Sequence, residues 1–121
     1  MISAITIPLV VDYDVTQGSK LFAQQLNYNG YVTMQVVAKG LTGTLNGTVK
    51  GQQTIHLEDN SSFVDISSFS VTLDAANATD IVEKTTPLVC GYFGALFTQI
   101  GLTGGTISIY LRILPLTLTN L

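Results

Sequence analysis

The sequence predicts an all-β protein, an antiparallel β-sandwich of two sheets with jelly-roll or immunoglobulin-like connections. Several segments alternate apolar and polar residues with the two-residue period of a half-buried strand. Clusters of Gly, Asn, Asp and Ser separate these segments at short, regular intervals. No helical period of useful length lies between them, as a parallel sheet would require. We therefore expect about seven to nine short antiparallel strands.

The composition indicates one apolar domain, residues 1–121, whose surface is partly covered in an assembly. Only 11% of the residues are charged and 46% are hydrophobic, whereas about a quarter are charged in an ordinary soluble domain. Such a chain is too apolar for intrinsic disorder. No apolar run approaches the roughly 18 to 20 residues of a membrane-spanning helix. No basic residue precedes Lys20, so we expect no secretory signal and synthesis without export.

The first predicted strand directs alternate apolar residues to one face, namely Ile5, Ile7, Leu9 and Val11. Pro8 assigns this strand to a sheet edge, because proline cannot donate to the ladder. Residues 20–26 form a second, weaker candidate strand. The Asn-Tyr-Asn-Gly sequence of residues 27–30 predicts a turn.

The next predicted strand, residues 31–38, buries every second residue: Val32, Met34, Val36 and Ala38. Four glycines between Gly40 and Gly51 indicate either a flexible loop or a bulged, twisted pair of strands. Residues 54–58 alternate again, with Ile55 and Leu57 predicted inside.

The middle of the sequence continues this pattern. Residues 59–62 have the composition of a turn, and residues 63–66 of a short strand or corner. The following strand, residues 67–74, places three apolar side chains on one face: Phe69, Val71 and Leu73. Residues 81–89 are ambiguous, because Pro87 is unfavourable in a central strand.

Residues 91–100 are apolar on both faces, which is typical of a strand central to a stack or at a subunit contact. A turn then leads to a strand at residues 106–113, whose outward side chains are predicted to face solvent or a neighbour: Ser108, Tyr110 and Arg112. The apolar continuation, residues 114–121, is predicted to be a C-terminal assembly arm.

Candidate catalytic residues are few. His56 is the only histidine and Cys90 the only cysteine. A nucleophile with a histidine base requires the two to be in hydrogen-bond reach, and nothing in the sequence near Cys90 indicates an activated thiol. A single cysteine also excludes an internal disulfide framework and a multi-cysteine metal site. We interpret Cys90 as a buried apolar residue and His56 as a solvent-facing or interface residue.

The acidic residues give a weak indication of chemistry. Paired carboxylates could come from Asp12 with Asp14 or from Glu58 with Asp59, but acids in turns usually bond to backbone amides. Calcium could be held by Asp59, Asn60 and Asp65, although their order is not that of an EF-hand. We expect no catalytic residue, metal or cofactor.

Other ligand classes receive little support. The glycine-rich segment lacks the spacing of a phosphate-binding loop. The net charge is −3 and the five basic residues are dispersed along the sequence, so nucleic-acid binding is not expected. Five tyrosines could form a sugar-stacking surface, but no tryptophan accompanies them.

The sequence resembles small virion proteins of tailed and other bacteriophages. The resemblance rests on the Gly-Thr segment 43–51, the acidic turn that ends on an aromatic residue at 59–66, the alternating strand 69–73, the Tyr-Phe pair 92–93 and the Thr-Gly-Gly turn 103–105. It implies a compact β-sandwich that serves as a capsid decoration, head-fibre or tail-associated subunit, often as a trimer, without catalytic residues.

The resulting hypothesis is a non-enzymatic structural subunit of a virus particle, made in the host cytoplasm and assembled with itself and with other virion proteins. The apolar composition is consistent with the large apolar interfaces of permanent assemblies. The predicted interface residues are Tyr92, Phe93, Phe97, Tyr110, Leu114, Leu116 and Leu118. The alternative is a carbohydrate-binding or adhesin-like β-sandwich, and an enzyme with His56 as its base is a third reading.

Overall fold

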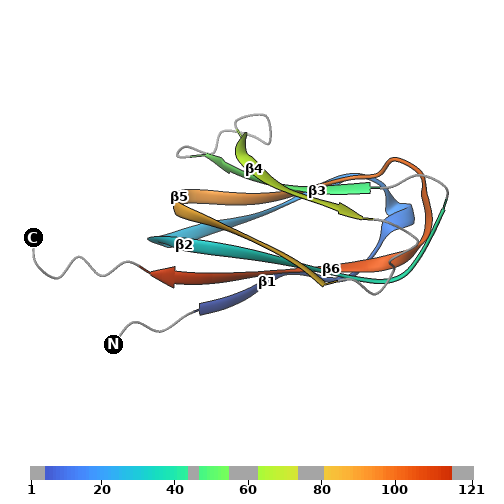
Figure 1. Cartoon of the computed structure of the whole chain (residues 1–121), viewed down its shortest axis with the longest axis horizontal. Helices are drawn as coiled ribbons and strands as arrows, with labels where there is room; N and C mark the ends of the chain where they lie inside the picture. Colours follow the sequence, from blue (N-terminus) through green and yellow to red (C-terminus); the bar gives the residue numbers. More distant parts are fainter. Residues whose placement is uncertain (1–4, 44–46, 55–62, 74–80, 116–121) are drawn as a thin grey trace, which may run out of the picture.

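The computed structural model describes residues 5–43, 47–54, 63–73 and 81–115. Within them the chain forms antiparallel strands and one short 3-10 helix, η1 (Val15–Gln17), which lies between the first two strands (Figure 1). The strands are β1 (Ile5–Asp14), β2 (Lys20–Gly43), β3 (Gly47–Thr54), β4 (Val64–Leu73), β5 (Ile81–Thr98) and β6 (Leu102–Pro115).

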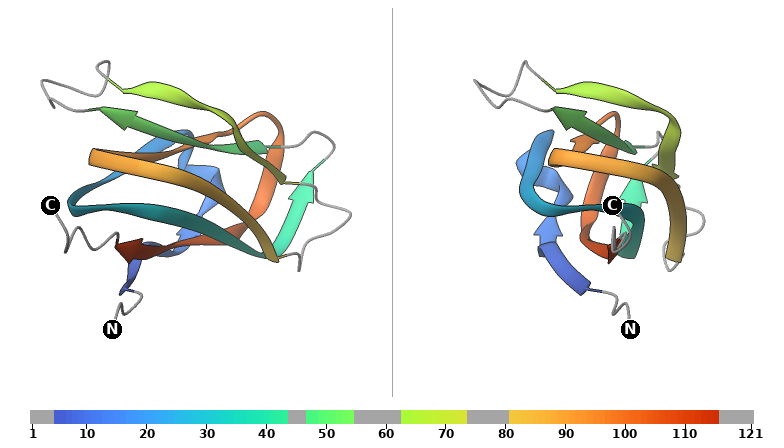
Figure 2. Two further views of the ribbon diagram at one scale, coloured as in Figure 1. Left: turned by 60° about the vertical axis from the view of Figure 1, so that its left-hand side comes forward. Right: turned by 90° about the vertical axis from the view of Figure 1, so that its left-hand side faces the viewer.

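The strands are arranged in two layers. Layer 1 holds β1, β6, residues 30–43 of β2 and residues 81–89 of β5. Layer 2 holds residues 20–26 of β2, residues 91–98 of β5, β3 and β4. Hydrogen bonding continues through all strands in the order β1-β6-β2-β5-β3-β4. The two layers are therefore one ladder that bends over, because β2 and β5 both pass from one layer to the other (Figure 2).

The pairing pattern is that of a jelly roll. If β2 and β5 are each counted as two segments, the chain has eight described segments: β1, residues 20–26, residues 30–43, β3, β4, residues 81–89, residues 91–98 and β6. The first segment pairs with the eighth, the second with the seventh, the third with the sixth and the fourth with the fifth. Representative pairs are Ile5 with Ile113, Leu21 with Leu96, Val36 with Val82 and Val49 with Val71. In each of these pairs, one partner lies about as many residues before the middle of the sequence as the other lies after it. The sequence thus forms one long antiparallel ribbon.

Rolling of this ribbon creates the remaining pairs. The third segment pairs with the eighth, as in Val36 with Ile109, and the fourth with the seventh, as in Val49 with Phe97. This arrangement of eight segments in two packed layers is a jelly roll. The predicted antiparallel two-sheet sandwich is confirmed, and the jelly-roll connection is the one of the two predicted alternatives that the structure adopts.

The core lies between the layers and is apolar. The predicted inward residues of β2 are fully or almost fully buried: Val32, Met34, Val36 and Ala38. The same holds for alternate residues of β6, namely Ile107, Ile109, Leu111 and Ile113. From layer 2, Phe69 packs edge-to-face on Phe93 with ring centroids 5.9 Å apart. Burial of each such large side chain contributes about 1.5–3 kcal/mol.

One end of the sandwich is closed by η1 and the turn between β5 and β6. Gln99 connects them, because its Nε2 donates to the carbonyls of Val15 (2.7 Å) and Leu102 (2.9 Å) while its Oε1 accepts from the Leu102 N–H. Asp14 caps η1: hydrogen bonds from the Thr16 hydroxyl and then from its N–H lower the pKa of this exposed carboxyl below its usual value.

Strand β1 is an edge strand, as Pro8 predicted, but its apolar alternation is interrupted. The register with β6 shifts twice, between Pro8 and Val10 and between Val10 and Tyr13. Asp12 adopts a φ of 53° within the second irregularity, and its N–H donates to the Ser108 hydroxyl at 2.9 Å. The first shift reverses the phase of the strand, because Val10 rather than Leu9 lies opposite the buried Ile109. The prediction that Val11 shares one face with Ile5, Ile7 and Leu9 is therefore wrong: Val11 is 56% exposed.

The second irregularity of β1, at Asp12, corrects another prediction. Ser108 was expected to face solvent or a neighbour, but it is 4% exposed because β1 covers it. Its hydroxyl accepts the bond from the backbone that buries it, which satisfies a polar group that would otherwise be costly to bury.

The predicted turn at residues 27–30 has a different form from a simple loop. The chain reverses direction there (Figure 1), yet β2 continues through these residues and its two halves belong to different layers. Each half pairs with β5, and the register shifts between Leu26 and Gly30 and again between Gly30 and Val32. The turn residues thus bend the whole ribbon.

The other ambiguous segments are now assigned. Residues 40–43 belong to β2 and residues 47–51 to β3, so these residues lie in strands rather than in a flexible loop. The predicted strand pair is wrong, because the described residues of β2 pair with β5 and β6 and those of β3 pair with β4 and β5. Residues 81–89 are part of β5 at the edge of layer 1, a position that tolerates Pro87. The predicted strand at residues 55–58 lies outside the described residues, as does the turn at 59–62.

Gly51 allows the closest contact within layer 2. A Cβ atom at this buried position would overlap the ring of Phe69. We therefore expect Gly51→Ala to destabilise the protein by about 1–3 kcal/mol through overpacking, measured as a lower urea midpoint.

The variant Phe69→Leu tests whether the ring is the cause. It loses some core packing alone, but the double variant Gly51→Ala/Phe69→Leu should be more stable than the sum of the two single effects predicts. Strict additivity would contradict the contact.

Candidate functional site

The described residues that were singled out for chemistry form no metal-binding group. Among residues 5–43, 47–54, 63–73 and 81–115 there is no group of three or more His, Cys, Asp or Glu side chains that could hold a metal ion. His56, Glu58, Asp59 and Asn60 lie outside the described residues. Cys90 belongs to β5, but its side chain is not described.

The described carboxylates have structural roles. Asp14 caps η1, and its neighbour Asp12 bonds through its backbone to Ser108. Asp65, one of the three predicted calcium ligands, accepts a hydrogen bond of 2.7 Å from Gln52 Nε2 and lies 3.8 Å from Lys50 Nζ. This ion pair is exposed, so it contributes little to stability.

The described interior between the layers is filled by apolar side chains, and the buried polar residue Ser108 lies outside this cluster, beneath β1. An interior of this kind contributes packing energy rather than ligand contacts. The outer faces of the two layers therefore provide the candidate interaction surfaces.

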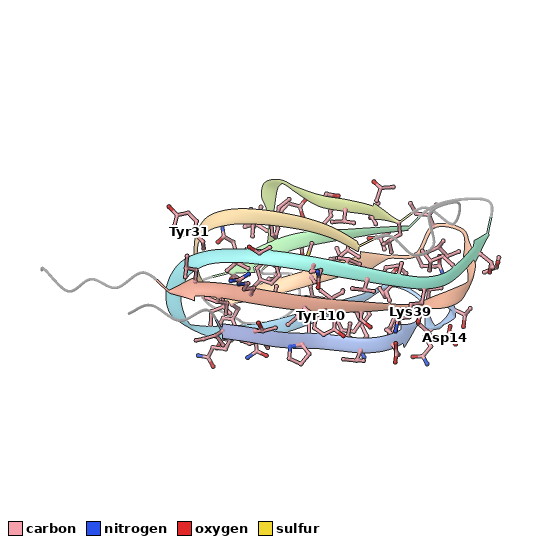
Figure 3. The ribbon with its side chains drawn as sticks, turned by 60° about the horizontal axis from the view of Figure 1, so that its bottom comes forward. Asp14, Tyr31, Lys39 and Tyr110 are labelled. Atoms are coloured by element: carbon pink, nitrogen blue, oxygen red, sulfur yellow. The ribbon has the colours of Figure 1, made fainter. Side chains whose placement is uncertain are left out.

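A shallow pocket of about 510 Å³ lies on the outer face of layer 1. We call it the layer-1 pocket. Its lining residues come from β1, β2 and β6: Thr6, Tyr31, Thr33, Gln35, Tyr110, Leu111, Arg112 and Leu114. Strand register explains the gathering, because Thr33 and Thr6 both lie opposite Arg112, Gln35 lies opposite Tyr110, and Tyr31 lies opposite Leu114. Figure 3 shows Tyr31 and Tyr110 on this side of the sheet.

The layer-1 pocket combines aromatic, cationic and apolar groups. Tyr31 and Leu114 are 43% and 44% exposed, and Tyr110 is half-buried. Arg112 is exposed, and no acidic side chain within the described part of the chain forms an ion pair with it. The pocket can therefore stack a flat or ring-shaped group and donate hydrogen bonds to an anion.

A second pocket, of about 470 Å³, lies on the outer face of layer 2. We call it the layer-2 pocket; its lining residues are Ser19, Lys20, Leu21, Gln52, Phe63 and Leu96. Phe63 is only 7% exposed although it is not part of the main core. It lies over Gly94, where an added Cβ would come 3.0 Å from the ring and 2.8 Å from Leu21. The glycine thus lets the ring of Phe63 pack closely against the outside of the sheet.

The structure divides the predicted interface residues into groups. Phe93 and Phe97 are fully buried in the core of their own chain, so they have no surface to offer a partner. The reason is that β5 is central in layer 2, between β2 and β3. Tyr92 is half-buried on this strand, whereas Tyr110 and Leu114 line the layer-1 pocket. Leu116 and Leu118 lie outside the described residues.

The sequence did not identify Leu21 and Phe63 as surface-forming residues. Tyr31 was considered only as one of five tyrosines that could form a sugar-stacking surface, and its position opposite Leu114 follows from a pairing of residues far apart in sequence. The apolar outer face of residues 91–100 was a signal for the layer-2 pocket, but it did not identify Phe63 as the residue that covers it.

Comparisons with known proteins add no assignment. No model of a known protein family matches the sequence, and no curated protein matches it significantly. Separately, none of the helical residues that the structure describes forms a helix long and apolar enough to cross a membrane.

Proposed function

We propose that this protein is a non-enzymatic structural subunit of a virus particle, of the type of bacteriophage capsid decoration, minor capsid or head-fibre proteins. It assembles through apolar surfaces with copies of itself and with other virion proteins, after synthesis in the host cytoplasm. Jelly rolls occur in viral capsid proteins, lectin domains and cupins, so the fold alone supports more than one function.

The observation that carries the proposal lies at the end of β6. Leu114 and Tyr31 face each other across the β6 and β2 ladder and are both exposed by more than two fifths. The sequence continues from them as Pro-Leu-Thr-Leu-Thr-Asn-Leu. An exposed apolar pair followed by a leucine-rich segment is typical of a surface that another subunit covers.

Self-association of the full chain tests this proposal. We expect oligomers by light scattering at micromolar concentration, and at least about tenfold weaker association for Leu116→Asn/Leu118→Asn, since burying each leucine contributes about 1.5–3 kcal/mol. The matched control is Thr117→Ser/Thr119→Ser, which should associate like the unchanged chain.

The melting temperature separates assembly from folding. The leucine variant should melt close to the control at a concentration where both are monomeric. A stable monomer at all concentrations, without a partner, would contradict the proposal, and a large loss of folding in the leucine variant would place these leucines in the core.

A carbohydrate-binding module is the second candidate, and the layer-1 pocket favours it. Its volume lies within the range of small-molecule sites, and it brings together Tyr31, Tyr110 and Arg112. On this reading Tyr110→Ala should abolish the signals of a glycan array without changing self-association. Tyr92→Ala, a half-buried tyrosine of layer 2, is the control. Absence of any glycan signal and of a calcium-dependent melting shift would favour the structural subunit.

A further inference from the structure

Each layer has two lateral edges, and these differ in how open they are to another strand. The edges of layer 1 are β1 and residues 81–89 of β5, and those of layer 2 are β4 and residues 20–26 of β2. β2 pairs with β6 only from Gly30 onward, so residues 20–26 have β5 on one side and no described strand on the other. Such an edge presents unpaired N–H and C=O groups that can pair with another chain.

Three of these edges carry features that hinder pairing. β1 contains Pro8, two register shifts and the unusual backbone of Asp12. The edge half of β5 contains Pro87 and lies at a register shift. β4 shifts register against β3 between Lys50 and Gln52. Prolines, bulges and charges of this kind are the usual protection of sheet edges.

Residues 20–26 have little of this protection. Their register with β5 is unbroken from Lys20 opposite Phe97 to Leu26 opposite Gly91. They contain no proline, and Lys20 at their beginning is the single charged residue. An edge with unbroken register and a single charge, in a protein whose other described edges carry prolines or register shifts, indicates an edge that is paired in the functional state.

The surface next to this edge is apolar. Leu21, Phe63 and Leu96 of the layer-2 pocket lie on its outer side, and Phe22 and Leu26 on its inner side retain 9% and 6% exposure. A strand added beside residues 20–26 would place alternate side chains over the layer-2 pocket and could bury apolar groups there.

The sequence after β6 fits this position. Residues 116–119 read Leu-Thr-Leu-Thr, so apolar and polar residues alternate there with the period of a strand, and Asn120 ends the alternation. No charged side chain in the segment opposes burial beside Leu21 and Phe63.

A second copy is the better acceptor than the same chain. β6 ends with Pro115 opposite Gly30, at the end of the sandwich where β2 bends between the layers. The arrow of β6 points out of that end of the sandwich (Figure 1). To reach residues 20–26 of its own chain, the segment that follows Pro115 directly would have to change layer and reverse direction, which requires a turn.

We propose that residues 116–121 of one copy pair as an added strand with residues 20–26 of a second copy, with Leu116 and Leu118 over the layer-2 pocket. This inference rests on the proposed function, because it requires self-association, and it specifies the surface that accepts the arm. The contact is heterologous, so it generates rings if the rotation closes and open chains if it does not.

Amide hydrogen exchange of the full chain at an associating concentration tests the pairing. Those amides of residues 20–26 that do not bond to β5 should exchange at least about tenfold more slowly in the unchanged chain than in Leu116→Asn/Leu118→Asn. Thr117→Ser/Thr119→Ser should keep the protection. Amide exchange of residues 5–14, the layer-1 edge whose proline and register shifts hinder strand pairing, should be the same in all three chains.

A variant on the acceptor side tests the same contact without touching the arm. Ala23 is exposed on the open edge, so Ala23→Lys should fold normally and weaken self-association by about tenfold. Thr72→Lys, on the exposed side of β4, is the matched control and should associate normally.

The outcomes separate this inference from the proposed function. If the unchanged chain is monomeric at every concentration, the proposed function fails and the inference with it. If the chain associates but residues 20–26 exchange equally in all variants, or remain protected when both leucines are replaced, the inference alone is overturned.

Discussion

The continuous antiparallel pairing of β2 with β5 is the constraint on which the rest of the structure depends. These two strands form the middle of the ribbon and belong to both layers, so their bend sets the position of one layer on the other. The bend occurs where Gly30 shifts the register and where Gly91, opposite Leu26, adopts a φ of 86°. Glycine is the residue that adopts this backbone conformation without steric cost. β6 and β3 then add to the two halves that the bend has separated.

The fold also explains much of the low charge of the sequence. A jelly roll with a filled interior needs inward-facing apolar residues on every strand, and Phe93 and Phe97 serve this purpose rather than an interface. Among the described large apolar side chains, Val11, Val64 and Ile100 are exposed at separate positions. Tyr31 and Leu114 are exposed together at the end of β6, and the partly exposed Leu21 and Leu96 flank Phe63 on layer 2. These two places, rather than the overall hydropathy, support the proposed assembly.

Strand alternation made a large part of this fold predictable. Residues 32–38 and 69–73 show the two-residue period clearly, and their burial follows it. Alternation is a local property, because side-chain direction changes at every residue. It fails at bulges: the irregularities of β1 exposed Val11 and covered Ser108, and no residue of β1 alone indicates where the register with β6 shifts.

Pairing between distant segments was not predictable in the same way. The composition of residues 27–30 indicated a reversal but not whether its flanks pair with each other or with β5. The layer-1 pocket depends on the opposition of Tyr31 and Leu114, which are far apart in sequence. Likewise, the open edge at residues 20–26 exists because β6 pairs with β2 only beyond the bend.

Nuclear Overhauser contacts between backbone protons test the ribbon most directly. The structure predicts contacts between the strands on both sides of the bend, at Leu21 with Leu96 and at Val36 with Val82. A local hairpin at residues 27–30 would instead pair residues 20–26 with residues 31–38. Observation of both long-range pairs would support the rolled ribbon, and contacts between the two halves of β2 in their place would contradict it.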